Sequence, residues 1–191
     1  MTATRLILCS SSPYRRELLA RLQLDFEVHA PDVDESQRPD ETPQALVERL
    51  ALAKAQAVAA RYPQSLVIGS DQVAVHGTVI VGKPHTHERA LAQLRAASGN
   101  SIMLYTGLAL VNAASGRVQS EVVPYRVVFR QLSERQIENY LRREQPYSCA
   151  GSVKSEGLGA ALLERFEGDD PATLIGLPLL AITQPFLSAW P

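Results

Sequence analysis

The stretch that decides the fold is LILCSSSPYRR, residues 6–16. Its first four residues, Leu6 to Cys9, form the short apolar run that is typical of a buried strand. Ser12 is then placed as a helix N-cap, Pro13 stands at the first helical position, and leucines follow at helical spacing. The stretch therefore predicts a strand, a serine-rich loop and a helix, which together form a building unit of α/β proteins.

Outward from this unit, strand-like and helix-like segments continue to the end of the chain. The expected strands are residues 26–29, 66–68, 73–75, 79–81, 102–111 and 118–132, and the expected helices start after Thr42, Thr86, Ser133 and Gly176. The strand at 66–68 is expected to end at Gly69-Ser70-Asp71. The order of segments is neither strictly alternating nor segregated, so we expect a mixed α/β sheet with helices on both faces.

Composition bounds the class of protein. The chain has 191 residues, of which 46% are hydrophobic. This length suits one compact domain or two closely packed lobes, and we expect a single domain over residues 1–191. The net charge of −1 argues against a nucleic-acid partner. Two cysteines cannot form a disulfide framework, which favours a reducing, cytoplasmic location. No segment approaches the roughly 18 apolar residues of a membrane span, so no membrane partner is expected.

An anion site is expected where the first strand meets its helix. The N-terminus of a helix offers unpaired N–H groups and partial positive charge. The hydroxyls from Ser10 to Ser12 and the guanidinium groups of Arg15 and Arg16 add donors that suit phosphate. The alternative is a capped helix with solvated arginines.

Carboxylates are concentrated in two places. Residues 25–41 contain seven acidic residues, including Glu35, against one arginine. Asp71 is expected at the end of a buried strand, where α/β sheets bind ligands. A carboxylate cluster beside a phosphate cradle suits a Mg²⁺–nucleotide enzyme. An ordinary solvated acidic loop is the alternative for residues 25–41.

Two lysines and one glutamate complete the set of candidates. Lys54 lies on an alanine-rich helix, and Lys83 lies in a Gly-Lys-Pro turn, where a surface lysine is the alternative for each. Glu156 lies in a polar loop that contains several glycines. Two interpretations of Glu156 are open: it accepts hydrogen bonds from a nucleotide base, or it is an ordinary acidic residue of a loop.

Taken in order, these segments resemble the Maf-type nucleotide pyrophosphatases. The matching motifs are LILCSSSPYRR (6–16), PDVDE (31–35), ALAKA (51–55), IGSDQ (68–72), GKP (82–84), YTGL (105–108), AGSVKSEG (150–157) and residues 167–178. Each motif is short, but they follow one another colinearly over nearly the whole chain. The resemblance implies a mixed, elongated α/β sheet flanked by helices, of the Maf/ITPase-like kind, with the active site in a cleft. It also implies a family in which homodimers are common.

The resemblance also implies a reaction: hydrolysis between the α- and β-phosphates of a nucleoside triphosphate, with a divalent cation such as Mg²⁺ or Mn²⁺. Asp71 is the implied proton acceptor. The implied substrate-binding residues are Ser10, Arg15, Arg16, Lys54 and Lys83, and the implied metal ligands are Glu35 and Asp71.

Three residues resemble the 7-methyl-GTP pyrophosphatase branch of the family: Tyr14, Gln72 and Glu156. Tyr14 departs from the tryptophan that this branch often carries. The alternatives are a dTTP/UTP pyrophosphatase of the same family and a non-catalytic nucleotide-binding regulator of cell division. The presence of both Asp71 and Glu35 favours the enzyme.

Overall fold

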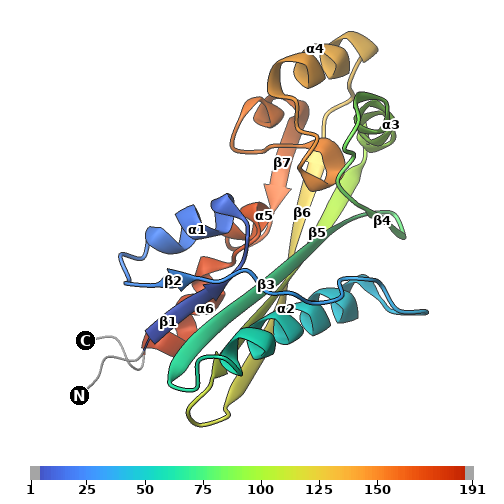
Figure 1. Ribbon diagram of the computed structural model, residues 1–191. Helices are drawn as coiled ribbons and strands as arrows, with labels where there is room; N and C mark the ends of the chain where they lie inside the picture. Colours follow the sequence, from blue (N-terminus) through green and yellow to red (C-terminus); the bar gives the residue numbers. More distant parts are fainter. Residues whose placement is uncertain (1–4, 188–191) are drawn as a thin grey trace. The chain divides into compact units, whose positions relative to one another are not determined.

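The structure is a computed structural model that describes residues 5–187, with side chains to residue 183 (Figure 1). The strands are β1 (Arg5–Cys9), β2 (Glu27–Val28), β3 (Ser65–His76), β4 (Val79–Val81), β5 (Ser101–Asn112), β6 (Val118–Phe129) and β7 (Leu163–Glu167). The helices are α1 (Pro13–Ala20), α2 (Pro43–Ala59), α3 (His87–Ala97), α4 (Glu134–Glu144), α5 (Ala172–Ile175) and α6 (Leu179–Leu187), with 3-10 turns η1 (Ala150–Ser152) and η2 (Leu158–Leu162).

The strands form a seven-stranded mixed sheet in the order β2-β1-β3-β5-β6-β7, with β4 paired to β3. β1 is parallel to β2 and to β3, whereas β4 and β7 are antiparallel to their neighbours. The predicted mixed α/β sheet flanked by helices is therefore confirmed.

The chain divides into two compact units. The first comprises Met1–Gln72, Thr106–Val123 and Asp170–Pro191, and the second comprises Val73–Tyr105 and Pro124–Asp169. β3, β5 and β6 each run from one unit into the other. The first unit contains α1, α2, α5 and α6, and the second contains α3 and α4.

In the first unit, alternate residues of β1 pack into two separate hydrophobic cores, one on each face of the strand. Leu6 and Leu8 pack with the leucines of α1 and with Ile182 of α6. Ile7 and Cys9 pack on the other face, with the alanines of α2. Because both faces are covered, β1 has the continuous apolar sequence that is typical of a strand buried on both sides.

The predicted helix starts are confirmed where the signal is local. The Ser12 hydroxyl accepts a hydrogen bond from the Arg15 N–H at 3.4 Å, as expected of an N-cap. Ser133 and Gln136 form a reciprocal capping box at the start of α4.

The prediction that a strand ends at Gly69-Ser70-Asp71 is wrong, because β3 continues through these residues to His76. Gly69 does not form a turn; it allows a close contact between β3 and α2. A Cβ atom at this position would overlap the carbonyl oxygen of Ala51, so glycine lets the backbone of α2 lie against β3. The buried Ser70 hydroxyl is satisfied within the unit, since it donates to the Gly176 carbonyl at 3.0 Å.

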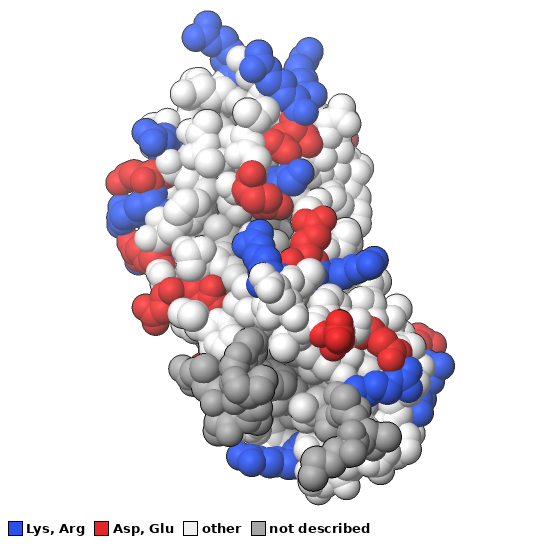
Figure 2. Space-filling model, turned by 90° about the vertical axis from the view of Figure 1, so that its left-hand side faces the viewer, with Lys and Arg blue, Asp and Glu red and all other residues white. Residues whose placement is uncertain are grey.

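On the face shown in Figure 2, acidic and basic side chains lie among one another over most of the surface, and a group of Lys and Arg side chains lies at the top of the view. The net charge of the chain is −1. Within residues 5–187, no helix has the length and apolar character needed to cross a membrane.

Replacing Gly69 with alanine should destabilise the fold by about 1–3 kcal/mol, because the new methyl group must push α2 away from β3. Urea unfolding measures the change. Gly82→Ala is the matched control, since a Cβ at Gly82 meets no atom within 4 Å and should leave stability within about 0.5 kcal/mol. Equal midpoints for the two variants would refute this account of Gly69.

Candidate functional site

The candidate site is centred on a buried lysine in the first unit. The Lys54 Nζ lies 2.7 Å from Asp71 Oδ1 and 2.7 Å from Glu35 Oε1. Lys54 is 5% exposed and Asp71 is 9% exposed. The charged lysine is stable there because two carboxylates compensate for the water it loses. The structure thus brings together three of the predicted site residues.

The packing of α2 explains why Lys54 reaches Asp71. Ala51 and Ala55 flank Lys54 on one face of the helix and contact Gly69 of β3. Asp71 follows Gly69 by two residues, so both lie on the same face of the strand. Gly69 therefore sets the distance between the helix and the carboxylate.

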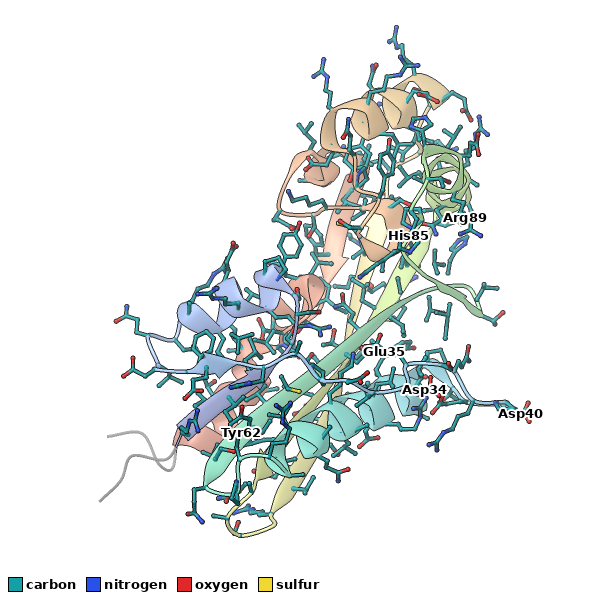
Figure 3. The ribbon with its side chains drawn as sticks, viewed as in Figure 1. Asp34, Glu35, Asp40, Tyr62, His85 and Arg89 are labelled. Atoms are coloured by element: carbon teal, nitrogen blue, oxygen red, sulfur yellow. The ribbon has the colours of Figure 1, made fainter. Side chains whose placement is uncertain are left out.

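The acidic loop divides into anchoring and site-directed residues. Glu41 accepts hydrogen bonds from Arg49 at 2.6 and 2.8 Å, and this pairing lowers the pKa of Glu41 to about 2. Asp34 accepts from the Ser36 N–H at 2.9 Å. Glu35 lies beside β3 with its side chain 62% exposed, whereas Asp40 points outward from the loop (Figure 3). Only Glu35 among these acids contacts Lys54.

The serine loop at the start of α1 uses part of its hydrogen-bonding capacity on itself. Ser10 is buried, and its hydroxyl accepts from the Ser12 N–H at 3.0 Å. The Ser12 hydroxyl accepts from the Arg15 N–H. Substrate binding by Ser10 stays a prediction. Tyr14 is half-buried in the first turn of α1, and its role in substrate specificity also stays a prediction.

Arg15 and Arg16 have different surroundings. Arg15 is half-buried, donating from Nε to the Gly176 carbonyl at 2.9 Å and from Nη1 to the Ser70 carbonyl at 2.7 Å. Burial lowers the pKa of the Arg15 guanidinium, while Asp71 and Glu35 act to raise it. Arg16 is exposed and makes no side-chain hydrogen bond or ion pair within residues 5–187. Phosphate binding stays a prediction for both.

The hydrogen bonds of Gln72 fix the orientation of its amide. Nε2 donates to the Thr173 carbonyl at 2.6 Å and to the Thr106 hydroxyl at 2.8 Å. A carbonyl oxygen only accepts, so the NH₂ group must face it. The amide oxygen Oε1 is therefore the atom of Gln72 that remains for a ligand.

Lys83 and Glu156 belong to the second unit. Lys83 is exposed in the turn between β4 and α3. Glu156 is exposed in the loop before η2, and its Oε2 accepts from the Ser155 hydroxyl at 3.2 Å. Their contacts with a substrate stay predictions.

Sequence reasoning missed the residues that surround Gln72 and Arg15. Thr106 and Thr173 are buried. Among the buried side-chain nitrogen and oxygen atoms in the described part of the chain, the Thr173 hydroxyl oxygen is the one that lacks a hydrogen bond. Gly176 was identified from the sequence only as the residue before the last expected helix, and the structure places it in a turn. Its φ of 110° is consistent with that turn, and its carbonyl also accepts from Arg15 and from Ser70.

Glu35 and Asp71 fit a divalent metal by the chemistry of their donors. Both present carboxylate oxygens, and both contact the same lysine nitrogen. No group of three or more His, Cys, Asp or Glu residues suited to a metal occurs in residues 5–187. A pair of carboxylates is nonetheless enough for Mg²⁺, which takes its remaining ligands from water and substrate phosphates.

Arg15→Ala should destabilise the first unit by about 1–3 kcal/mol, because the buried Ser70 carbonyl loses a charged donor. Arg16→Ala, as the matched control, should change stability by less than about 0.5 kcal/mol. Thermal or urea unfolding measures both. A stable Arg15→Ala variant would mean that the two carbonyl contacts do not support the fold.

The sequence of this chain is similar to those of known proteins. The family described as Maf-like protein matches residues 5–188. A 7-methyl-GTP pyrophosphatase of Nitrosococcus oceani is 62% identical over 179 residues, which cover 94% of this chain and 90% of that protein. A crystal structure of a Vibrio cholerae protein aligns over 98% of this chain and 99% of its own, with 11% identity and a TM-score of 0.44. The chain belongs to the Maf-like protein family.

Proposed function

We propose that this protein is a nucleoside triphosphate pyrophosphatase that hydrolyses 7-methyl-GTP to 7-methyl-GMP and diphosphate. Two findings support the proposal: membership of the Maf-like family, and 62% identity to a protein named 7-methyl-GTP pyrophosphatase. The single structural observation that carries the chemistry is the buried Lys54, held between Asp71 and Glu35. We further propose that residues 1–191 act as one domain in the cytoplasm, as a homodimer.

Asp71 is the group that accepts a proton from the attacking water. Its Oδ1 is fixed by Lys54 at 2.7 Å, and its other oxygen makes no hydrogen bond to any described residue. A carboxylate held in this way needs no reorientation before it accepts a proton. The ammonium of Lys54 compensates for negative charge on Asp71 and on a phosphate bound nearby.

Glu35 and Asp71 would together hold a Mg²⁺ or Mn²⁺ ion. When bound, such an ion neutralises phosphate charge and polarises the phosphorus–oxygen bonds. The exposure of Glu35 leaves it free to turn from Lys54 toward an ion. Ser10, Arg15, Arg16, Lys54 and Lys83 are the residues that we propose bind the triphosphate.

Base selection is assigned to Tyr14, Gln72 and Glu156. The free Oε1 of Gln72 accepts hydrogen bonds, and so does the carboxylate of Glu156. The Watson–Crick edge of guanine supplies two adjacent N–H donors to such acceptors. Methylation at N7 gives the base a positive charge, which favours a carboxylate and the face of an aromatic ring.

Asp71→Asn should lower the rate of 7-methyl-GTP hydrolysis by about 100-fold or more, since the amide cannot accept the proton from water. Mass spectrometry of the products in Mg²⁺ or Mn²⁺ measures the rate and shows whether diphosphate is released, with chelator as a blank. Asp25→Asn, at an exposed position, is the matched control. Hydrolysis at the wild-type rate by the Asp71 variant would disprove the mechanism.

Glu156→Gln should reduce kcat/KM for 7-methyl-GTP about tenfold more than for dTTP or UTP, because only the purine presents the paired donors. The exposed Glu121→Gln variant is the control. An equal loss on all three nucleotides would assign Glu156 to loop structure. A wild-type enzyme that prefers dTTP or UTP would instead place this chain in the other branch of the family.

A further inference from the structure

Gln93 of α3 joins two loops of the second unit. Its Nε2 donates to the Gly82 carbonyl at 3.1 Å, and its Oε1 accepts from the Ser152 hydroxyl. The Gly82 carbonyl only accepts, so the NH₂ group must face it and Oε1 must face the hydroxyl. One side chain thus contacts the turn that carries Lys83 and the loop that carries Glu156.

The Ser152 end of this bridge is buried and strained. Ser152 is fully buried, with a φ of 60°, in the left-handed region that residues other than glycine rarely occupy. Gly151 before it has a φ of 70°. A strained conformation persists only where surrounding contacts hold it, and the hydrogen bond to Gln93 is such a contact.

The far end of the same loop is held by Glu144, the last residue of α4. Its Oε2 accepts from the Leu158 N–H at 2.7 Å, and its Oε1 lies 3.4 Å from Lys154 Nζ. The Lys154 N–H donates to the Tyr140 hydroxyl at 2.9 Å. Glu156 is therefore carried by a loop anchored at both ends, and Gln93 provides the anchor that is shared with the Lys83 turn.

We propose that Gln93 is a positioning residue that fixes the Lys83 turn and the Glu156 loop relative to each other. It binds no substrate itself. The proposal rests on the function proposed above, in which Lys83 contacts the triphosphate and Glu156 contacts the base. Glutamine suits the task because it donates with one atom and accepts with the other. Glutamate can only accept, and leucine can do neither.

Three variants separate the two ends of the bridge. Gln93→Glu keeps an acceptor for Ser152 but loses the donor to Gly82, so kcat/KM should fall about fivefold on 7-methyl-GTP, dTTP and UTP alike. Ser152→Ala removes only the other contact, so the preference for 7-methyl-GTP over dTTP and UTP should fall about fivefold. Gln93→Leu should show both effects.

The double variant Gln93→Leu with Ser152→Ala should show the same preference as Gln93→Leu alone, because both changes remove one hydrogen bond. Gln56→Leu and Gln56→Glu, at an exposed position of α2, are the matched controls and should leave kinetics unchanged. Fully additive losses of preference in the double variant would contradict a shared contact.

Hydrogen–deuterium exchange gives a readout that does not depend on the substrate. Gln93→Glu should speed exchange in residues 82–86, Ser152→Ala in residues 152–158, and Gln93→Leu in both. If Gln93→Leu leaves the exchange of residues 152–158 and the nucleotide preference at wild-type values, the proposal is overturned. A wild-type protein that does not cleave 7-methyl-GTP refutes the proposed function alone, since the exchange data still test the bridge.

Discussion

The close approach of α2 to β3 is the constraint on which the candidate site depends. Gly69 has no side chain, so the alanine face of α2 rests directly on the strand. That contact places Lys54 within 2.7 Å of Asp71, and the resulting ion pair offsets the desolvation free energy of burying both charges. Packing and electrostatics are therefore coupled here: any shift of the helix separates the charges, and an unpaired charge opposes the packing.

The parts of the fold that could be predicted from the sequence are those fixed by neighbouring residues. The Ser12 cap and the Ser133 capping box depend on partners three residues away, and both are present. Gly69-Ser70-Asp71 has the composition of a turn, yet it lies within β3. The contacts that keep it in the strand come from α2 and from Gly176, which are remote in the sequence. Such contacts cannot be predicted from the residues that neighbour Gly69 in the sequence.

The same distinction applies to the site. Sequence reasoning selected Lys54, Asp71 and Glu35 by chemical type, and the structure places them in contact. It did not predict that Arg15 donates to the carbonyls of Ser70 and Gly176. Every residue has a backbone carbonyl, so no residue type in the sequence marks the particular ones that accept from a side chain. Arginine has five N–H donors, so these two contacts leave others for a phosphate.

Two glutamines show how one chemical rule produces different roles. Gln72 and Gln93 each donate from Nε2 to a backbone carbonyl, which fixes the direction of the amide. The Oε1 of Gln93 is taken by Ser152, so this glutamine holds structure together. The Oε1 of Gln72 has no such partner in the described part of the chain. Gln72 follows Asp71 directly in β3, so the two side chains leave opposite faces of the strand, Asp71 toward Lys54 and Gln72 toward Thr106 and Thr173. The Thr173 carbonyl holds the donor end of the Gln72 amide, so in the function that we propose the acceptor end is the one that would meet N–H groups of a ligand.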